Sequence, residues 1–117
     1  MNEKIKLEDE ITSLLTSFQS VFFGITENTV LSDLDRRMGE YDKAEAVRFF
    51  SFYRPLVQEL FAEIEKYQRP TQAGEILGED SFDVKRLAGD VVARHSGARP
   101  EYLERIARQI VYWRYLR

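Results

Sequence analysis

Cysteine is absent from this chain of 117 residues, and histidine occurs once, as His95. Without cysteine there is no disulfide, no thiolate metal site and no cysteine nucleophile. A single histidine also excludes the pair of Glu-x-x-His motifs that a di-metal site in a helical bundle requires. We therefore expect no catalytic residue, no metal and no cofactor, and we predict that the protein is not an enzyme.

Long apolar runs are missing too. No run of about 18 apolar residues, the shortest that predicts a membrane-spanning helix, occurs in the chain. The first ten residues, MNEKIKLEDE, lack the basic start and apolar core of a secretory signal. We expect a soluble, cytoplasmic protein that has no membrane segment.

Alternation of apolar and polar residues, which indicates a half-buried strand, nowhere continues long enough to predict one. Apolar residues instead recur three and four positions apart, as in amphipathic helices. The expected helices cover residues 3–23, a short stretch ending near 37, 43–54, 56–67, 82–95 and 100–117. The sequence thus predicts an all-α fold, a compact bundle of five or six helices in a single domain, 1–117.

Residues with special backbone preferences mark the first boundaries. Gly24 is placed to end the first helix, and Gly39 to break the second. Thr26 or Asn28 is available to cap the second helix, and Asp42 to cap the third. Side chains of these types accept hydrogen bonds from the free amides of a first helical turn.

Proline and a polar stretch mark the later boundaries. Pro55 removes a backbone donor, so we expect a kink or a helix restart there. The candidate linker is 69–81, and Asp80 or Ser81 caps the helix that follows it. Pro100 occupies the favoured first-turn position of the last helix.

Charge is unevenly distributed along the chain, whose net charge is −3. Residues 1–80 hold 9 basic and 16 acidic residues, a net −7, whereas 81–117 hold 8 basic and 4 acidic residues, a net +4. Such a basic end suits a nucleic-acid-facing surface. The more common arrangement is a basic segment that attracts the acidic part of the same fold.

One stretch, 89–108, implies more than amphipathic packing. Its sequence, GDVVARHSGARPEYLERIAR, predicts a helix, a tight turn and a second helix. Gly97 supplies the turn, and the apolar residues on either side of it are Val92, Ala93, Ala98, Leu103 and Ile106. This order resembles the helix-turn-helix of DNA-binding repressors, in which a glycine opens the corner. We expect Gly97 to adopt a positive φ.

The resemblance covers 20 residues and implies duplex DNA as a partner. It places the DNA-binding residues near the start of the second helix, at Arg99, Glu101, Arg105 and Arg108. Arginines there contact guanine edges or phosphates, whereas a glutamate contacts only cytosine amines. We expect Arg99, Arg105 and Arg108 to be solvent-exposed on one edge. One recognition helix reads little sequence, so such a regulator is expected to be a dimer.

The far end of the last helix offers an alternative. A projection of about 100° per residue places Tyr102, Leu103, Ile106, Ile110 and Trp113 on its inner side. Val111, Tyr112 and Tyr115 then face outward with Arg108. Exposed tyrosines beside an arginine are typical of a protein interface. The two hypotheses are therefore a helix-turn-helix DNA-binding regulator and a small helical subunit or adaptor, which binds a protein partner or a second copy through this C-terminal aromatic face.

Overall fold

A computed structural model describes residues 3–70 and 79–116 of the chain. Six α-helices occur in these residues: α1 (Glu3–Leu14), α2 (Phe18–Phe23), α3 (Glu27–Met38), α4 (Lys43–Glu63), α5 (Val84–Arg94) and α6 (Pro100–Val111). Two 3-10 turns, η1 (Ile64–Tyr67) and η2 (Glu79–Ser81), flank the segment 71–78, and a π turn, η3 (Tyr112–Leu116), follows α6. The all-α prediction is confirmed, and the described residues contain no strand, only a single bridge between Gln68 and Phe82.

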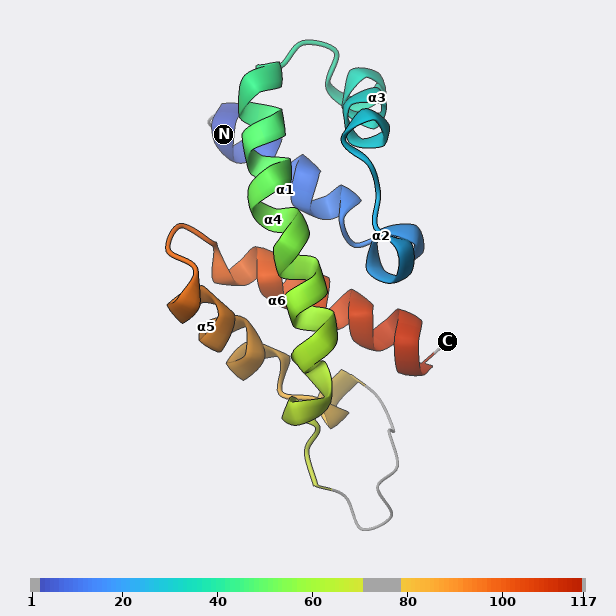
Figure 1. The fold of residues 1–117 in the computed structure, drawn as a ribbon, viewed down its shortest axis with the longest axis vertical. Coiled ribbons are helices and arrows are strands. Elements are labelled where there is room, and N and C mark those ends of the chain that lie inside the picture. The colour runs from blue at the N-terminus through green and yellow to red at the C-terminus, as the bar shows by residue number, and fades with distance from the viewer. Residues whose placement is uncertain (1–2, 71–78, 117) are drawn as a thin grey trace.

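Helix α4 is the central helix of the molecule. It runs along the longest axis, and α1, α2, α3, α5 and α6 all pack against it (Figure 1). Its buried side is apolar or aromatic throughout, with Ala46, Phe50, Tyr53, Leu56, Val57 and Leu60. The predicted restart at Pro55 is wrong, because α4 continues through it. Pro55 and Ser51, whose carbonyl loses its helical donor, are both exposed residues, so that carbonyl is not left in the core.

Most predicted caps are present. The Thr26 side chain accepts a hydrogen bond from the Thr29 amide, and Asp42 does the same for the Glu45 amide. Pro100 is in the first turn of α6, as expected. Helix α5 differs, because its cap is Asp83 and not Asp80 or Ser81.

The first expected helix, 3–23, is two helices. Helix α1 ends at Leu14, and the Ser17 hydroxyl accepts a hydrogen bond from the Ser20 amide at 3.1 Å to begin α2. The Thr16 hydroxyl donates to the Ser13 carbonyl at 2.6 Å, which closes the last turn of α1. These local bonds compete with helix continuation. As a result, α2 turns away from the axis of α1 (Figure 1).

The last expected helix, 100–117, also changes character. Regular α-helix ends at Val111, and Tyr112–Leu116 form a π turn. A π turn has more residues per turn than an α-helix, so side chains after Val111 leave the 100° projection. The predicted faces of Tyr112, Trp113 and Tyr115 are therefore shifted.

Candidate functional site

Helices α5 and α6 follow one another along the chain and pack against each other, with a short turn between them. The connecting Gly97 has φ +96°, so the predicted positive φ is confirmed. Ala98 is buried behind the corner, and α5 presents Leu87 and Val91 to the core. The geometry of the corner follows from a conformation that only glycine adopts without strain.

The start of α6, where DNA is read in helix-turn-helix proteins, is tied to α1 through Arg99 and Arg105. The Arg105 guanidinium donates to the Asp9 carboxylate at 3.1 Å, to the Asp9 carbonyl at 3.1 Å and to the Thr12 hydroxyl at 2.6 Å. It also lies over the Tyr102 ring. The expected exposure of Arg105 is therefore wrong, because an interhelical ion pair holds this side chain half-buried.

The other three DNA-binding candidates are exposed, as expected, but each has an ion-pair partner of opposite sign. Arg99 Nε lies 3.0 Å from the buried carboxylate of Glu8 in α1, and Arg99 also pairs with Glu101 at 3.9 Å. Arg108 pairs with Glu104 at 3.7 Å. Basic and acidic groups thus alternate on this end of α6, so its local charge is close to balanced.

Behind this end of α6 lies a polar cluster formed by buried Glu8, buried Tyr53 and exposed Arg99. The Tyr53 hydroxyl donates to the Glu8 carboxylate at 2.6 Å and accepts from the Arg99 amide at 3.2 Å. Burial, together with the hydrogen bond to Glu8, raises the pKa of the Tyr53 phenol well above its usual value. The cluster joins α1, α4 and the corner before α6, three elements that are distant in sequence.

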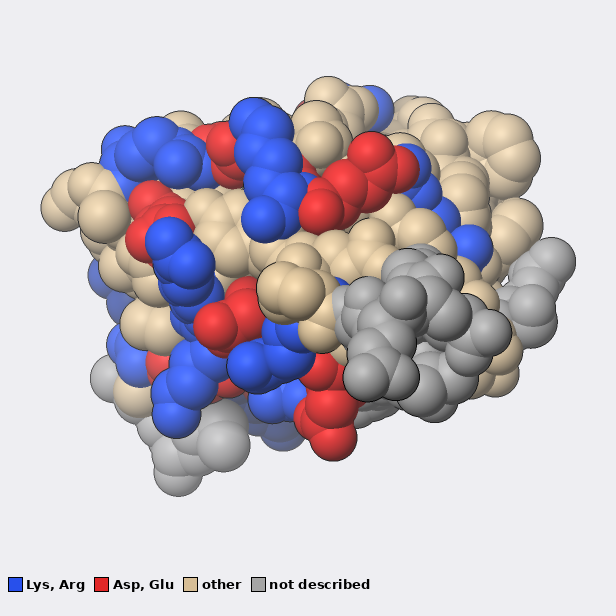
Figure 2. Space-filling model, turned by 90° about the horizontal axis from the view of Figure 1, so that it is seen from below, with Lys and Arg blue, Asp and Glu red and all other residues tan. Residues whose placement is uncertain are grey.

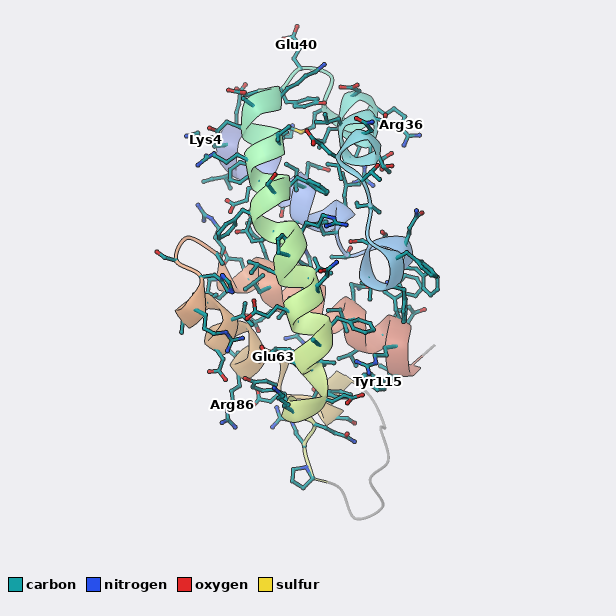
Figure 3. The ribbon with its side chains drawn as sticks, viewed as in Figure 1. Lys4, Arg36, Glu40, Glu63, Arg86 and Tyr115 are labelled. Carbon is teal, nitrogen blue, oxygen red and sulfur yellow. The ribbon has the colours of Figure 1, made fainter. Side chains whose placement is uncertain are left out.

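Attraction within the fold accounts for much of the basic C-terminal charge. Arg94 pairs with Glu59 and Glu63 of α4, and His95 lies 2.7 Å from Glu59. Partial burial raises the pKa of the Glu59 carboxyl, but the bonds from Arg94 and His95 outweigh it and hold the pKa below its usual value. Glu63 lies on the side of α4 that faces α5 (Figure 3). The interpretation in which the basic end attracts the acidic part of the same fold is confirmed.

The predicted C-terminal face is only partly exposed. Val111 is completely buried, so its expected exposure is wrong. Tyr115 is half-buried and stacks on the Phe82 ring, with 4.7 Å between the ring centroids. Trp113 is half-buried, and its indole N–H donates to the Thr16 carbonyl at 3.0 Å. Of the three residues assigned to this face, Tyr112 alone is exposed, with 42% of its surface accessible.

Tyr112 instead belongs to a larger exposed cluster that includes α2. We name this cluster the aromatic surface; it consists of Phe18, Phe22, Phe23, Phe61, Tyr112 and Trp113. Ring centroids lie 5.6 Å apart for Phe18 and Trp113, 5.6 Å for Phe22 and Phe61, and 4.9 Å for Tyr112 and Trp113. Phe23 is 77% exposed and Phe22 is 37% exposed. Three segments, α2, the end of α4 and the start of η3, thus form one aromatic surface.

Few acidic groups surround the aromatic surface. Residues 11–26, which include all of α2, contain no charged side chain. Seen from below, the side of the molecule that carries α5 has interleaved basic and acidic residues, whereas the side that carries α2 and the C-terminal end is mostly uncharged (Figure 2). Helix α2 therefore adds no charge to the aromatic surface.

A pocket of about 180 Å³ opens in the aromatic surface between α2 and α4. Its walls are the second half of α2, including Phe22 and Phe23, together with Gln58 and Phe61 of α4. Arg114 lies over the Phe61 ring, 4.6 Å from its centroid, and donates to the Phe61 carbonyl. Arg54, one helical turn before Gln58, donates to the Ile25 carbonyl at 3.3 Å. A guanidinium therefore lies near each end of this pocket.

Phe22 and Phe23 were not identified as site residues by their sequence pattern. Phe22 continues the apolar spacing of 3–23, so a single helix places it on the buried side. Two signals point the other way: the adjacent hydroxyl residues Thr16 and Ser17, which suit a helix cap, and the adjacency of the two phenylalanines, since neighbouring helical residues do not face the same side.

In comparisons with known proteins, no protein-family model, no curated protein and no solved structure matches the chain. Within residues 3–70 and 79–116, no helix combines the length and apolar character needed to cross a bilayer. In the same described parts, no three metal-ligating side chains gather as a cluster.

Proposed function

We propose that this protein is a non-catalytic adaptor or subunit that binds another protein through the aromatic surface. The observation that carries the proposal is the exposure of Phe23, Phe22 and Tyr112 side by side with half-buried aromatic neighbours. Aromatic side chains are enriched among the residues that dominate binding energy at protein interfaces. A contiguous apolar patch of this kind on a soluble protein commonly marks an interaction site.

Binding of duplex DNA receives less support from the same geometry. Arg105 would have to give up its bonds to Asp9 and Thr12, and Arg99 its bond to buried Glu8, before either reached a phosphate. Breaking a partly buried ion pair leaves an uncompensated charge behind. Glu101 and Glu104 on the same end of α6 would repel the phosphates.

A paired binding experiment tests the proposal. Immobilised wild-type protein is exposed to extracts of the cells that make it, in parallel with a variant carrying Phe23→Ser and Tyr112→Ser. Because both residues are exposed, this variant should keep the melting temperature of the wild type and lose the captured partner. A matched control is Gln19→Ser, an exposed residue of the same helix.

Duplex DNA forms the second arm of the experiment. Fluorescence anisotropy with random duplex DNA at ~50 mM salt detects even weak phosphate contacts, and we expect none. Duplex binding that disappears in the Arg105→Ala, Arg108→Ala variant would contradict the adaptor and support the regulator. Capture of the same partners by wild type and the aromatic variant would also contradict the proposal.

A further inference from the structure

The pocket between α2 and α4 combines an apolar wall with positive charge. Phe22, Phe23 and Phe61 supply the apolar wall. Arg54 lies against the α2 end of this pocket, since a Cβ atom added at Gly24 would be 3.0 Å from its Nη2 atom. The helical order Arg54, Gln58, Phe61 places all three on one side of α4, at spacings of four and three.

Arg54 differs from the arginines around it in its partners. Its guanidinium donates to a carbonyl, that of Ile25, and no carboxylate within the described residues forms an ion pair with it. Arginines 94, 99, 105 and 114 all pair with carboxylates of the chain. A guanidinium has five N–H donors in a fixed fork that matches a carboxylate. Arg54 therefore retains donor capacity beside the apolar pocket.

The second guanidinium beside the pocket lining, that of Arg114, is already paired. Arg114 covers Phe61, and the carboxylate nearest to it is that of Glu65, which is 64% exposed and already bonded to Arg114 at 2.6 Å. No charged residue lies between 11 and 26, so α2 adds no acid to the site. At physiological salt, charges beyond about 8 Å are largely screened. The positive charge that a partner meets at the pocket is therefore mainly that of Arg54, and distant charges of the chain contribute little.

We propose that the pocket binds an acidic segment of a partner protein, in which an apolar or aromatic side chain enters between Phe23 and Phe61 and a neighbouring carboxylate pairs with Arg54. This inference rests on the proposed function and specifies the chemistry of the partner. The apolar side chain provides the anchor, and the carboxylate fixes its orientation through a charge-assisted, bidentate bond. Complementary charge also selects against basic segments.

Selection from a displayed library of random 12-residue peptides, with the full-length chain as bait, tests the inference. Enriched peptides should carry Asp or Glu close to an aromatic or long aliphatic residue. Their affinity should fall about tenfold in Arg54→Gln, the loss expected for one charge-assisted hydrogen bond. Arg86→Gln is the matched control, because Arg86 lies on α5, away from α2, and contacts the Tyr67 ring (Figure 3).

One further variant and one NMR measurement on wild type separate a local charge effect from a folding defect. Arg54→Lys keeps the charge and one donor toward Ile25, so it should retain more affinity than Arg54→Gln. In wild type, backbone amide resonances of residues 22–24 and 58 should shift on addition of the selected peptide. Shifts confined to other residues would overturn the assignment of the pocket.

The remaining outcomes distinguish this inference from the proposed function. Peptides that depend on Phe23 but not on Arg54, or that are enriched in Lys and Arg, overturn the acidic partner and leave the adaptor standing. Peptides that bind the Phe23→Ser, Tyr112→Ser variant with the same affinity as wild type overturn both the acidic partner and the adaptor. A library that yields no binder also overturns both. Binding to phosphatidylserine vesicles that depends on Phe23 and Arg54, with no peptide selected, overturns both in favour of a lipid surface.

Discussion

Tyr53 shows how a single residue joins distant parts of this chain. Its ring is completely buried and makes edge contacts with Phe52 and Tyr102, while its hydroxyl bonds to Glu8 of α1 and to the amide of Arg99. Tyrosine suits this position because one end of the ring is apolar and the other forms hydrogen bonds. Phenylalanine would fill the same space without satisfying either polar partner.

We predict that Tyr53→Phe lowers the free energy of unfolding by about 1–3 kcal/mol, the usual penalty for leaving a buried polar group without a partner. Urea unfolding followed by circular dichroism measures the change. Tyr41→Phe is the matched control, because that hydroxyl bonds at the margin of the fold to Asp35 and the Leu31 carbonyl. An equal loss in both variants would mean that the Glu8 cluster contributes no more than an exposed hydrogen bond.

At the scale of helices, the local boundaries were predictable and the long-range contacts were not. Thr26, Asp42 and Pro100 act within their own helical turn, so their roles follow from a few neighbouring residues. The break after Leu14 results from the competition of Ser17 capping with helix continuation, and both are compatible with the same apolar spacing. The local pattern therefore does not decide between one helix and two.

The candidate site illustrates the same limit. The helix-turn-helix corner is a local feature, and its turn and its glycine were predicted. The partner of Arg105, Asp9, is 96 residues away, and only the packing of α1 on α6 brings them together. Phe22 and Phe23 became exposed because α2 forms a separate helix. Exposure of a side chain is a property of the whole packing, so projection of one helix predicts it poorly.

Substitution of two glycines tests whether the corner between α5 and α6 depends on its backbone conformation. Gly97 has φ +96°, and a Cβ atom there would meet only the Phe52 ring, at 4.0 Å. We predict that Gly97→Ala destabilises the protein by about 1 kcal/mol or more, through backbone strain and not through a clash. Gly89→Ala, inside α5 with open space around it, should stabilise by about 0.5–1 kcal/mol.

Thermal or urea unfolding of the two variants gives shifts of opposite sign if the corner depends on a left-handed glycine. Two stabilising substitutions would instead indicate that residue 97 relaxes to a right-handed conformation at little cost. The same chemical change at both positions keeps the hydrophobic contribution of the added methyl group nearly constant.

At the scale of the whole molecule, tyrosines couple stability to alkaline pH. Burial is the main cause that raises the pKa of the Tyr41 phenol to about 12. Burial is also the main cause that raises the pKa values of Tyr53, Tyr102 and Tyr115. The pKa of Tyr67 is raised mainly by its hydrogen bond to Asp90. A group whose pKa is higher in the folded state contributes stability that is complete below its unfolded pKa, here 10.0, and is lost at higher pH.

We therefore predict that the free energy of unfolding falls as pH rises above about 10, as the unfolded chain loses tyrosine protons before the folded one does. Urea unfolding at about pH 9 and about pH 11 measures this fall, and Tyr53→Phe should make it shallower. Tyrosinate absorbance gives an independent check. Titration of all six tyrosines of the folded protein near pH 10 would contradict the prediction.

The position of α4 also has a consequence for how the molecule opens. Every other α-helix in the described chain packs against α4, which has 21 residues. Detachment of any of these five helices therefore exposes part of α4. Peripheral helices still detach briefly and return, and α2, with six residues, is the shortest of them. Solvent reaches the buried side of the middle of α4 only when several neighbours leave together. Deuterium should therefore enter the amides of Leu56, Val57 and Leu60 last, at a rate that reports the unfolding of the entire chain.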